Sequence, residues 1–119
     1  MKNHKDLDAW KESIQLAVAI FKILESFPSS EMYGLTSQIK RSVVSISSNI
    51  AEGAARGSKK EFSRFLNIAL GSLSELETQM IISKELKFYN DDKVFNDIAR
   101  LQRLIGGLIR YTRKNQNSE

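Results

Sequence analysis

The sequence of 119 residues predicts an all-α protein, an up-down antiparallel four-helix bundle. Apolar residues recur at alternating steps of three and four along four segments, which is the spacing of an amphipathic helix, and long stretches lack the alternation of a strand. The chain holds one proline and six glycines, so little interrupts its helices. Short connections between helices of similar length favour antiparallel neighbours. We treat residues 1–119 as a single domain. Its predicted helices span residues 8–26, 30–56, 59–87 and 91–114.

The first predicted helix carries two apolar seams. One seam consists of Leu7, Trp10, Ile14, Ala17, Phe21 and Leu24, and the other of Leu16, Ile20, Ile23 and Phe27. One seam is enough to pack a bundle, so the second indicates either a central helix or a face that packs against another chain. The residue before Pro28 is disfavoured in a helix, which ends the segment, and Ser29 or Ser30 can cap the next one.

The second predicted helix ends where Gly57 can adopt the left-handed conformation. Ser58 and Glu61 then form a capping box, in which each side chain satisfies the free backbone N–H of the other, and the third helix begins there. The apolar residues of the second helix are Leu35, Ile39, Val43, Ile46 and Ile50. Those of the third helix are Phe62, Phe65, Leu66, Ala69, Leu73, Leu76 and Met80.

The fourth predicted helix follows a cap and first-turn acids supplied by Asn90, Asp91 and Asp92. Its predicted buried residues are Phe95, Ile98, Leu101, Leu104, Ile105 and Leu108. We expect this set to complete a single core together with the apolar residues of the other helices.

Small and polar residues form a ridge along the second and third helices. The ridge comprises Gln38, Ser42, Ser45, Asn49 and Glu52 on one helix, and Ile68, Ser72, Glu75 and Gln79 on the other. Two such ridges can face each other with their backbones close together, so that Asn49 and Glu52 hydrogen-bond across to Ser72 and Glu75. Buried polar groups must be satisfied and tend to select one packing register. We therefore assign a structural polar network to Gln38, Ser45, Asn49, Glu52, Ser72 and Glu75.

An enzymatic alternative would use Glu52 and Glu75. If these carboxylates approached each other, one of them would hold a proton at neutral pH. Such an enzyme would need an open pocket between the second and third helices.

Positive charge gathers at two places in the sequence. Arg56, Lys59, Lys60 and Arg64 surround the turn before the third helix, whose free N–H groups also favour phosphate. Between residues 98 and 118 the chain has five cations and no acid: Arg100, Arg103, Arg110, Arg113 and Lys114. A basic stripe on a rigid helix suits the phosphate backbone of a nucleic acid, although a solvated helix surface is an equal alternative. The candidate contacts are Arg41, Arg56, Lys59, Lys60 and Arg64, followed by Arg100, Arg103 and Arg110.

Composition limits the classes of function. The absence of cysteine excludes disulfides and thiolate metal sites and fits a cytoplasmic protein. His4 is the only histidine, so neither a histidine-based catalytic triad nor a di-iron site is expected. No apolar run approaches the ~18 residues that span a bilayer. A net charge of +4 and a pI near 9.4 suggest a polyanionic partner, with a merely basic soluble protein as an equal alternative on charge alone. We expect no enzymatic activity, metal, cofactor or membrane partner.

The segment from Phe27 to Met80 resembles the signature of the 23S rRNA intervening-sequence protein family. The matching pieces, in order, are Phe27-Pro28, Glu31, Tyr33-Gly34-Leu35, Gln38-Ile39-Lys40-Arg41, Ser45-Ile46, Asn49-Ile50-Ala51-Glu52-Gly53, Phe65-Leu66, Gly71-Ser72 and Glu75-Leu76-Glu77. The opening DLDAWKES is similar to the first helix of the family. The likeness covers nearly the whole chain and weakens after Leu86.

This resemblance implies a small bacterial four-helix-bundle protein that assembles as a homopentamer. Some members of the family are encoded within intervening sequences of large-subunit ribosomal RNA genes. A related branch, the accessory variability protein of diversity-generating retroelements, is a basic pentameric barrel that binds nucleic acid and a reverse transcriptase. A ring would give the second seam of the first helix a neighbour, and five copies would carry about +20.

The sequence therefore predicts a non-enzymatic, cytoplasmic homo-oligomer, a pentamer by resemblance, that binds RNA or DNA through backbone charge. Its context would be a ribonucleoprotein or an rRNA intervening sequence. The alternative is a protein-interaction scaffold ring without a nucleic-acid ligand, whose basic residues only keep it soluble. A protein partner such as a reverse transcriptase is compatible with this sequence.

Overall fold

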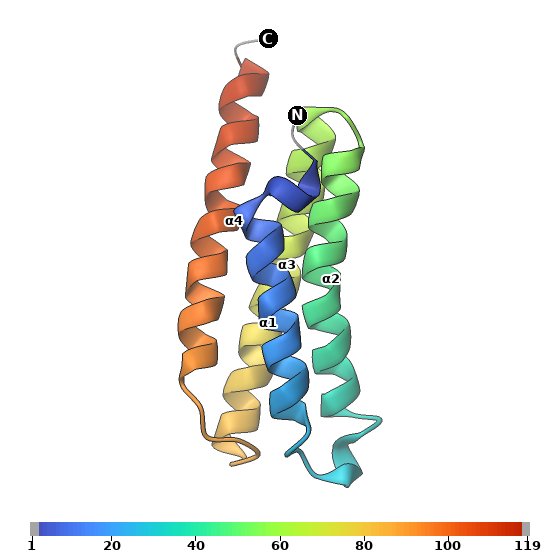
Figure 1. Ribbon diagram of the computed structural model, residues 1–119, viewed down its shortest axis with the longest axis vertical. Helices are drawn as coiled ribbons and strands as arrows, with labels where there is room; N and C mark the ends of the chain where they lie inside the picture. Colours follow the sequence, from blue (N-terminus) through green and yellow to red (C-terminus); the bar gives the residue numbers. More distant parts are fainter. Residues whose placement is uncertain (1–2, 118–119) are drawn as a thin grey trace.

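The computed structural model describes residues 3–117, with side chains as far as Lys114, and confirms the predicted all-α four-helix bundle. Four long helices run up and down side by side, and the bundle measures 51 × 23 × 20 Å (Figure 1). The long helices are α1 (Asp8–Leu24), α2 (Leu35–Ala55), α3 (Lys59–Glu85) and α4 (Lys93–Asn117). Two short 3-10 helices, η1 (His4–Asp6) and η2 (Ser29–Glu31), precede α1 and α2.

Each long helix packs against two others. Helix α1 contacts α2 and α4, and α3 likewise contacts α2 and α4. Helix α1 is therefore not central, and only one of its two seams can face the core. The buried face runs through Leu16, Ile20 and Phe27 of the second seam and Leu24 of the first, whereas Ile14 and Phe21 of the first seam are exposed.

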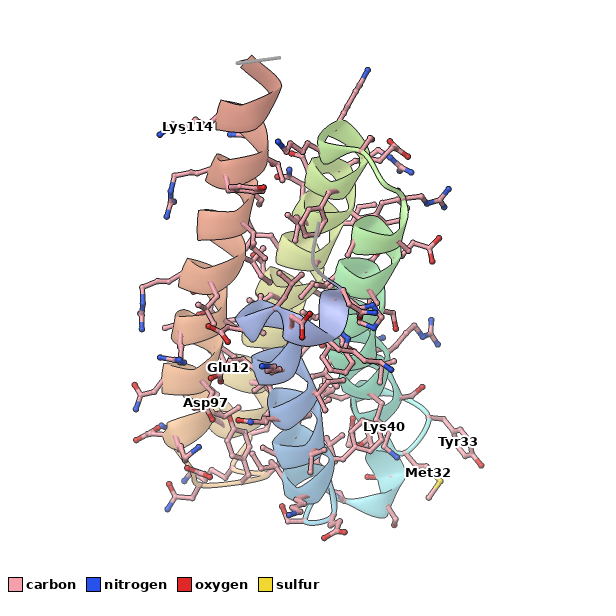
Figure 2. The ribbon with its side chains drawn as sticks, turned by 45° about the horizontal axis from the view of Figure 1, so that its top comes forward. Glu12, Met32, Tyr33, Lys40, Asp97 and Lys114 are labelled. Atoms are coloured by element: carbon pink, nitrogen blue, oxygen red, sulfur yellow. The ribbon has the colours of Figure 1, made fainter. Side chains whose placement is uncertain are left out.

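The helix ends differ from the predicted ones mainly between α1 and α2. Helix α2 begins at Leu35 rather than at residue 30, because η2 and Gly34 intervene. Ser29 and Ser30 both lie in η2, and no side chain caps the start of η2 or of α2, so the expected serine cap is wrong. The extra turn places Met32 and Tyr33 outside the bundle, where Figure 2 shows them projecting into solvent.

The turn between α2 and α3 follows the prediction more closely. Gly57 has a φ of +79°, in the left-handed region that favours glycine. The Ser58 hydroxyl accepts a hydrogen bond from the Glu61 N–H at 3.1 Å and so caps α3. This hydrogen bond is one half of the predicted capping box. The Glu61 side chain, which was expected to form the other half, accepts hydrogen bonds from Arg64.

Helix α3 is followed by a lysine in the left-handed conformation, which residues other than glycine seldom adopt. Lys87 has a φ of 63°, and the Phe88 N–H donates to the Ser83 carbonyl at 3.0 Å, which closes the last turn. The Tyr89 hydroxyl donates to the Met80 carbonyl at 2.9 Å. Burial, with a smaller effect of Asp91, raises the pKa of Tyr89 to about 12, so this donor keeps its proton at neutral pH.

One continuous core joins all four helices. The seven predicted apolar residues of α3 are all buried, as are Ile39, Val43, Ile46 and Ile50 of α2. The core stripe of α4 is shifted from the predicted one. Its fully buried members are Val94, Ile98, Leu101, Ile105 and Ile109, while Phe95, Leu104 and Leu108 pack at the edge. No helix within residues 3–117 is long and apolar enough to cross a membrane.

Gly53 lies at a close contact between α2 and α3. A Cβ built on this buried glycine would lie 2.6 Å from the Cβ of Phe65 and 3.1 Å from Cδ1 of Phe62. Real Cβ contacts are longer than this, so any larger residue would push the two helices apart. Because Gly53 has no side chain, Phe62 and Phe65 can pack into the core beside α2.

We predict that Gly53→Ala lowers the free energy of unfolding by about 1–3 kcal/mol, because the added methyl overpacks the contact with Phe65. The matched control is Gly71→Ala on α3, where a Cβ would meet nothing within 4 Å. This control should raise the free energy of unfolding by about 0.5–1 kcal/mol through helix propensity alone. Chemical denaturation followed by circular dichroism measures both, and equal effects of the two variants would contradict the close contact.

Candidate nucleic-acid interface

The two basic segments of the sequence meet at one end of the bundle. Because α3 and α4 are antiparallel, the first turn of α3 lies beside the last turns of α4 (Figure 1). The Nζ of Lys59 lies 5.6 Å from the centroid of the Tyr111 ring, which joins the two segments directly. Figure 2 shows Lys114 at this same end. We call this surface the basic end; its cations are Arg56, Lys59, Lys60, Arg64, Arg110, Arg113 and Lys114.

Two arginines of the basic end share one aromatic ring. The guanidinium carbons of Arg56 and Arg64 lie 5.1 Å and 4.5 Å from the centroid of the Phe65 ring. The ring itself is 8% exposed, and its position against Gly53 is set by the contact between α2 and α3. The two guanidinium groups are therefore seated on a rigid part of the core.

The same arginines also form ion pairs within their own helices. Arg56 donates to Glu52 at 2.8 Å, and Arg64 donates to Glu61 at 3.1 Å. The hydrogen bond from Arg64 holds the pKa of the Glu61 carboxyl below its usual range. Both pairs lie in solvent, where an ion pair contributes little to stability and can exchange for a phosphate at low cost.

Other predicted contacts lie away from the basic end. Arg41 is exposed in the half of α2 that is remote from the turn into α3. Arg100 donates to Glu12 at 3.0 Å and so ties α4 to α1. Arg103 is exposed between Arg100 and Arg110 along α4. The structure thus brings Arg56, Lys59, Lys60 and Arg64 together with Arg110 and separates them from Arg41 and Arg100.

Sequence reasoning did not rank Arg113 and Lys114 among the contacts. Their place near the end of α4 has a simple explanation, since cations complement the helix dipole there. The antiparallel topology nevertheless puts these exposed residues at the same end of the bundle as the turn between α2 and α3. The signal that could have found them was the combination of the predicted up-down topology with the two basic segments.

The polar ridge forms hydrogen bonds between α2 and α3, in a pattern that differs from the expected one. The Ser42 hydroxyl donates to the Glu75 carboxylate at 2.5 Å, and the hydroxyls of Ser45 and Ser72 lie 2.9 Å apart. The side-chain amide of Asn49 stays on its own helix, donating to the carbonyl of Ser45 at 2.8 Å and to its hydroxyl at 3.0 Å. The ridge therefore aligns the two helices through serines.

Two members of the predicted polar network stand outside it. Glu52 is exposed and pairs with Arg56 four residues along, so its expected hydrogen bond to α3 is wrong. Gln38 is exposed at the start of the ridge. Since Glu52 binds Arg56 while Glu75 binds Ser42, the two carboxylates do not form the proton-sharing pair of the enzymatic alternative. Within residues 3–117, no cluster of three or more metal-ligating side chains forms.

An apolar groove lies between α1 and α2. We call it the α1–α2 groove; it has a volume of about 660 Å³. Its apolar lining consists of Ile14, Ala17, Val18, Phe21 and Val44. Its rim carries both signs of charge, from Lys22, Lys40 and Glu25. The Nζ of Lys40 lies 5.2 Å from the centroid of the Phe21 ring. Ile14 and Phe21 belong to the first predicted seam of α1. Val18 and Val44 belong to none of the apolar sets predicted for α1 and α2.

Comparison with known proteins places the chain in a family. The model of the 23S rRNA-intervening sequence protein matches residues 5–109. The chain belongs to this family. No curated protein matches the chain. The family match agrees with the resemblance seen between Phe27 and Met80 and extends it into α4.

A solved structure supports the fold of this 23S rRNA-intervening sequence family member. It is the crystal structure of a protein with unknown function from the S23 ribosomal protein family of Bacteroides thetaiotaomicron. The TM-score is 0.77 at 24% sequence identity, and the match covers 86% of this chain and 95% of the other. At this sequence identity, the similarity shows that the two proteins share the same helical fold.

We predict that Ser45 and Ser72 are energetically coupled. In a double-mutant cycle with Ser45→Ala and Ser72→Ala, the coupling should be about 0.5–1.5 kcal/mol, because each hydroxyl loses its partner across the helix contact. Urea unfolding of the four proteins measures it. Ser74→Ala, on the exposed side of α3, serves as the control, and its effect should add to that of Ser45→Ala within about 0.5 kcal/mol. Additivity at Ser72 would show that the hydroxyl pair does not align the helices.

Proposed function

We propose that this protein binds the phosphate backbone of RNA or DNA through its basic end, as a non-enzymatic, cytoplasmic member of its family. The observation that carries the proposal is the meeting of the α2–α3 turn with the last turns of α4. Either segment alone would be an ordinary solvated helix surface. Together they form one cationic patch on three helices, which attracts a polyanion without reading its bases.

The distribution of charge supports a preferred orientation on the ligand. The carboxylates nearest the turn between α2 and α3 are Glu52 and Glu61, and each is paired with an arginine, while Asp6 and Asp8 lie beside Gly107 and Leu108 of α4. The opposite end carries many of the acids, Glu25, Glu31, Glu85, Asp91 and Asp92, with lysines between them. A polyanion approaching the molecule is therefore steered to the basic end, since the field there is positive.

The family name supports a ribosomal RNA context. The 23S rRNA-intervening sequence proteins are named after segments within ribosomal RNA genes, and a phosphate-binding protein fits a ribonucleoprotein that contains such RNA. The competing proposal is a protein-interaction scaffold, and the α1–α2 groove is the observation that favours it. The groove can be reconciled with nucleic-acid binding if it holds a second copy of this chain.

We propose accordingly that copies of the chain associate through the α1–α2 groove into a homo-oligomer, a pentamer if it follows the resemblance. Four of the apolar side chains that line the groove are exposed in one chain: Ile14, Val18, Phe21 and Val44, with Val18 at 52%. The rim has both positive and negative residues, so a rim lysine of one copy can pair with Glu25 of another. The groove also lies toward the end opposite the basic end, so that association there keeps the cationic patches apart.

We predict that binding to an RNA hairpin weakens log-linearly with salt and that Lys60→Glu lowers the slope by about one, because one phosphate contact is lost. Lys60 is exposed on α3 at the basic end. Fluorescence anisotropy across a salt series gives the slope. Lys87→Glu is the matched control, since it exchanges an exposed lysine of the opposite end and alters the net charge equally. Equal slopes for both variants, or no binding of the parent protein at low salt, would contradict the proposal.

We predict that Val18→Glu shifts the protein toward a monomer of 13.5 kDa, because a carboxylate placed in the apolar groove cannot be desolvated at the contact. Sedimentation equilibrium or light scattering measures the mass. Gln15→Glu adds the same charge at another exposed position of α1 and should leave the mass of the oligomer unchanged. If Val18→Glu keeps the parent mass, or if the parent protein is itself a monomer of 13.5 kDa, association of copies through the groove is contradicted.

A further inference from the structure

We infer that the ligand of the basic end is double-helical rather than single-stranded nucleic acid. This inference rests on the proposed function and narrows its ligand. Proteins that bind single strands combine a basic surface with aromatic rings on which successive bases stack. Proteins that bind a duplex need only present cations to the phosphates of its two strands. The state of the aromatic rings at the basic end separates these two modes.

The aromatic rings that contact the cations of the basic end already hold cations on their faces. The Phe65 ring is almost fully buried, with Arg56 and Arg64 over it, so no base can reach its face. The Tyr111 ring is 48% exposed, and the Lys59 ammonium lies over it. These rings bind cations on their faces. They therefore position positive charge for phosphate groups and do not stack bases.

Two of the cations are held in place by a buried ring. Arg56 and Arg64 both lie over Phe65, while their ion pairs with Glu52 and Glu61 are exposed to solvent and can exchange. Phe65 in turn is wedged against Gly53. An array of charges with preset positions binds a regular, stiff polyanion at little entropic cost, whereas a flexible strand must first be ordered against it. A duplex offers such a regular array of phosphates.

The breadth of the basic end fits a duplex. Its cations come from three helices, α2, α3 and α4, and the bundle measures 23 by 20 Å in cross-section. At about 3.4 Å per phosphate along each strand, a surface of this width faces roughly six base pairs. Cations presented by three helices can contact both strands across a groove, while a single strand would follow only one line of them.

The test compares a duplex with one of its own strands. Dissociation constants are measured by fluorescence anisotropy over a salt series, for an RNA duplex, a DNA duplex and the matching single strands. We expect both duplexes to bind at least about tenfold more tightly than the single strands at equal salt. We also expect a steeper salt slope for the DNA duplex than for its strand, since each phosphate contact contributes about 0.9 against about 0.7. The difference between the RNA and DNA arms identifies which helix form the patch prefers.

Tyr111→Leu separates a ring that seats Lys59 from a ring that stacks a base. We expect duplex and single-strand affinities to fall together and by less than about threefold, because the charge of Lys59 remains. A stacking ring would instead cost about tenfold for single strands alone, which would overturn the inference. Tyr33→Leu, at a tyrosine that is 93% exposed on the opposite end, should change neither affinity.

The outcomes distinguish this inference from the proposed function. Single strands that bind as tightly as the duplexes, or more tightly, overturn the duplex preference and leave backbone binding intact. A protein that binds none of the four ligands at low salt overturns the proposed function and the inference with it. Far-UV circular dichroism of Tyr111→Leu verifies that the bundle is folded before either conclusion is drawn.

Discussion

The contact of Gly53 with Phe65 is the constraint on which the rest of the molecule depends. It lets α2 and α3 approach until a single Cβ would be too large between them. The same approach holds the Phe65 ring in place, and on that ring lie the guanidinium groups of Arg56 and Arg64. Core packing and the position of surface charge are therefore coupled. If α2 and α3 moved apart at Gly53, Phe65 would move and the two arginines with it. The hydrophobic core supplies stability, but this one glycine sets where the charge is presented.

Farther along the same two helices, serines maintain the alignment that Gly53 begins. The Ser45–Ser72 and Ser42–Glu75 hydrogen bonds follow each other by one turn of each antiparallel helix, so they agree on a single register. A slip of one residue would break both, whereas the apolar residues alone would tolerate several alignments. The small side chains therefore have two roles: they allow close approach, and they select one among the close-packed arrangements.

Much of this bundle follows from its sequence. Amphipathic spacing identified every buried apolar residue of α3, and Ser58 and Gly57 located the turn before it. The departures have local causes that spacing does not capture. Glu52 has the right period to face α3, but Arg56 lies four residues away on the same helix and offers a closer partner in solvent. The two basic segments are far apart in the sequence. They lie at one end of the bundle only because α3 packs antiparallel to α4. Sequence separation hides a site whose parts come together through topology.

The position of the α1–α2 groove relative to the basic end has a consequence for assembly. Copies of a cationic chain repel each other, and the repulsion decays over about a Debye length, ~8 Å at physiological salt. The bundle is 51 Å long, so a contact made toward one end can keep the cations of the other end beyond that distance. In the proposed assembly, the apolar lining would then stabilise the contact with little electrostatic opposition. The patches of an assembly would act on one polyanion together, and several weak sites joined in this way bind far more tightly than one. If the proposed function holds, separation of the groove from the basic end would therefore let a chain with only +4 charge bind a nucleic acid as an assembly.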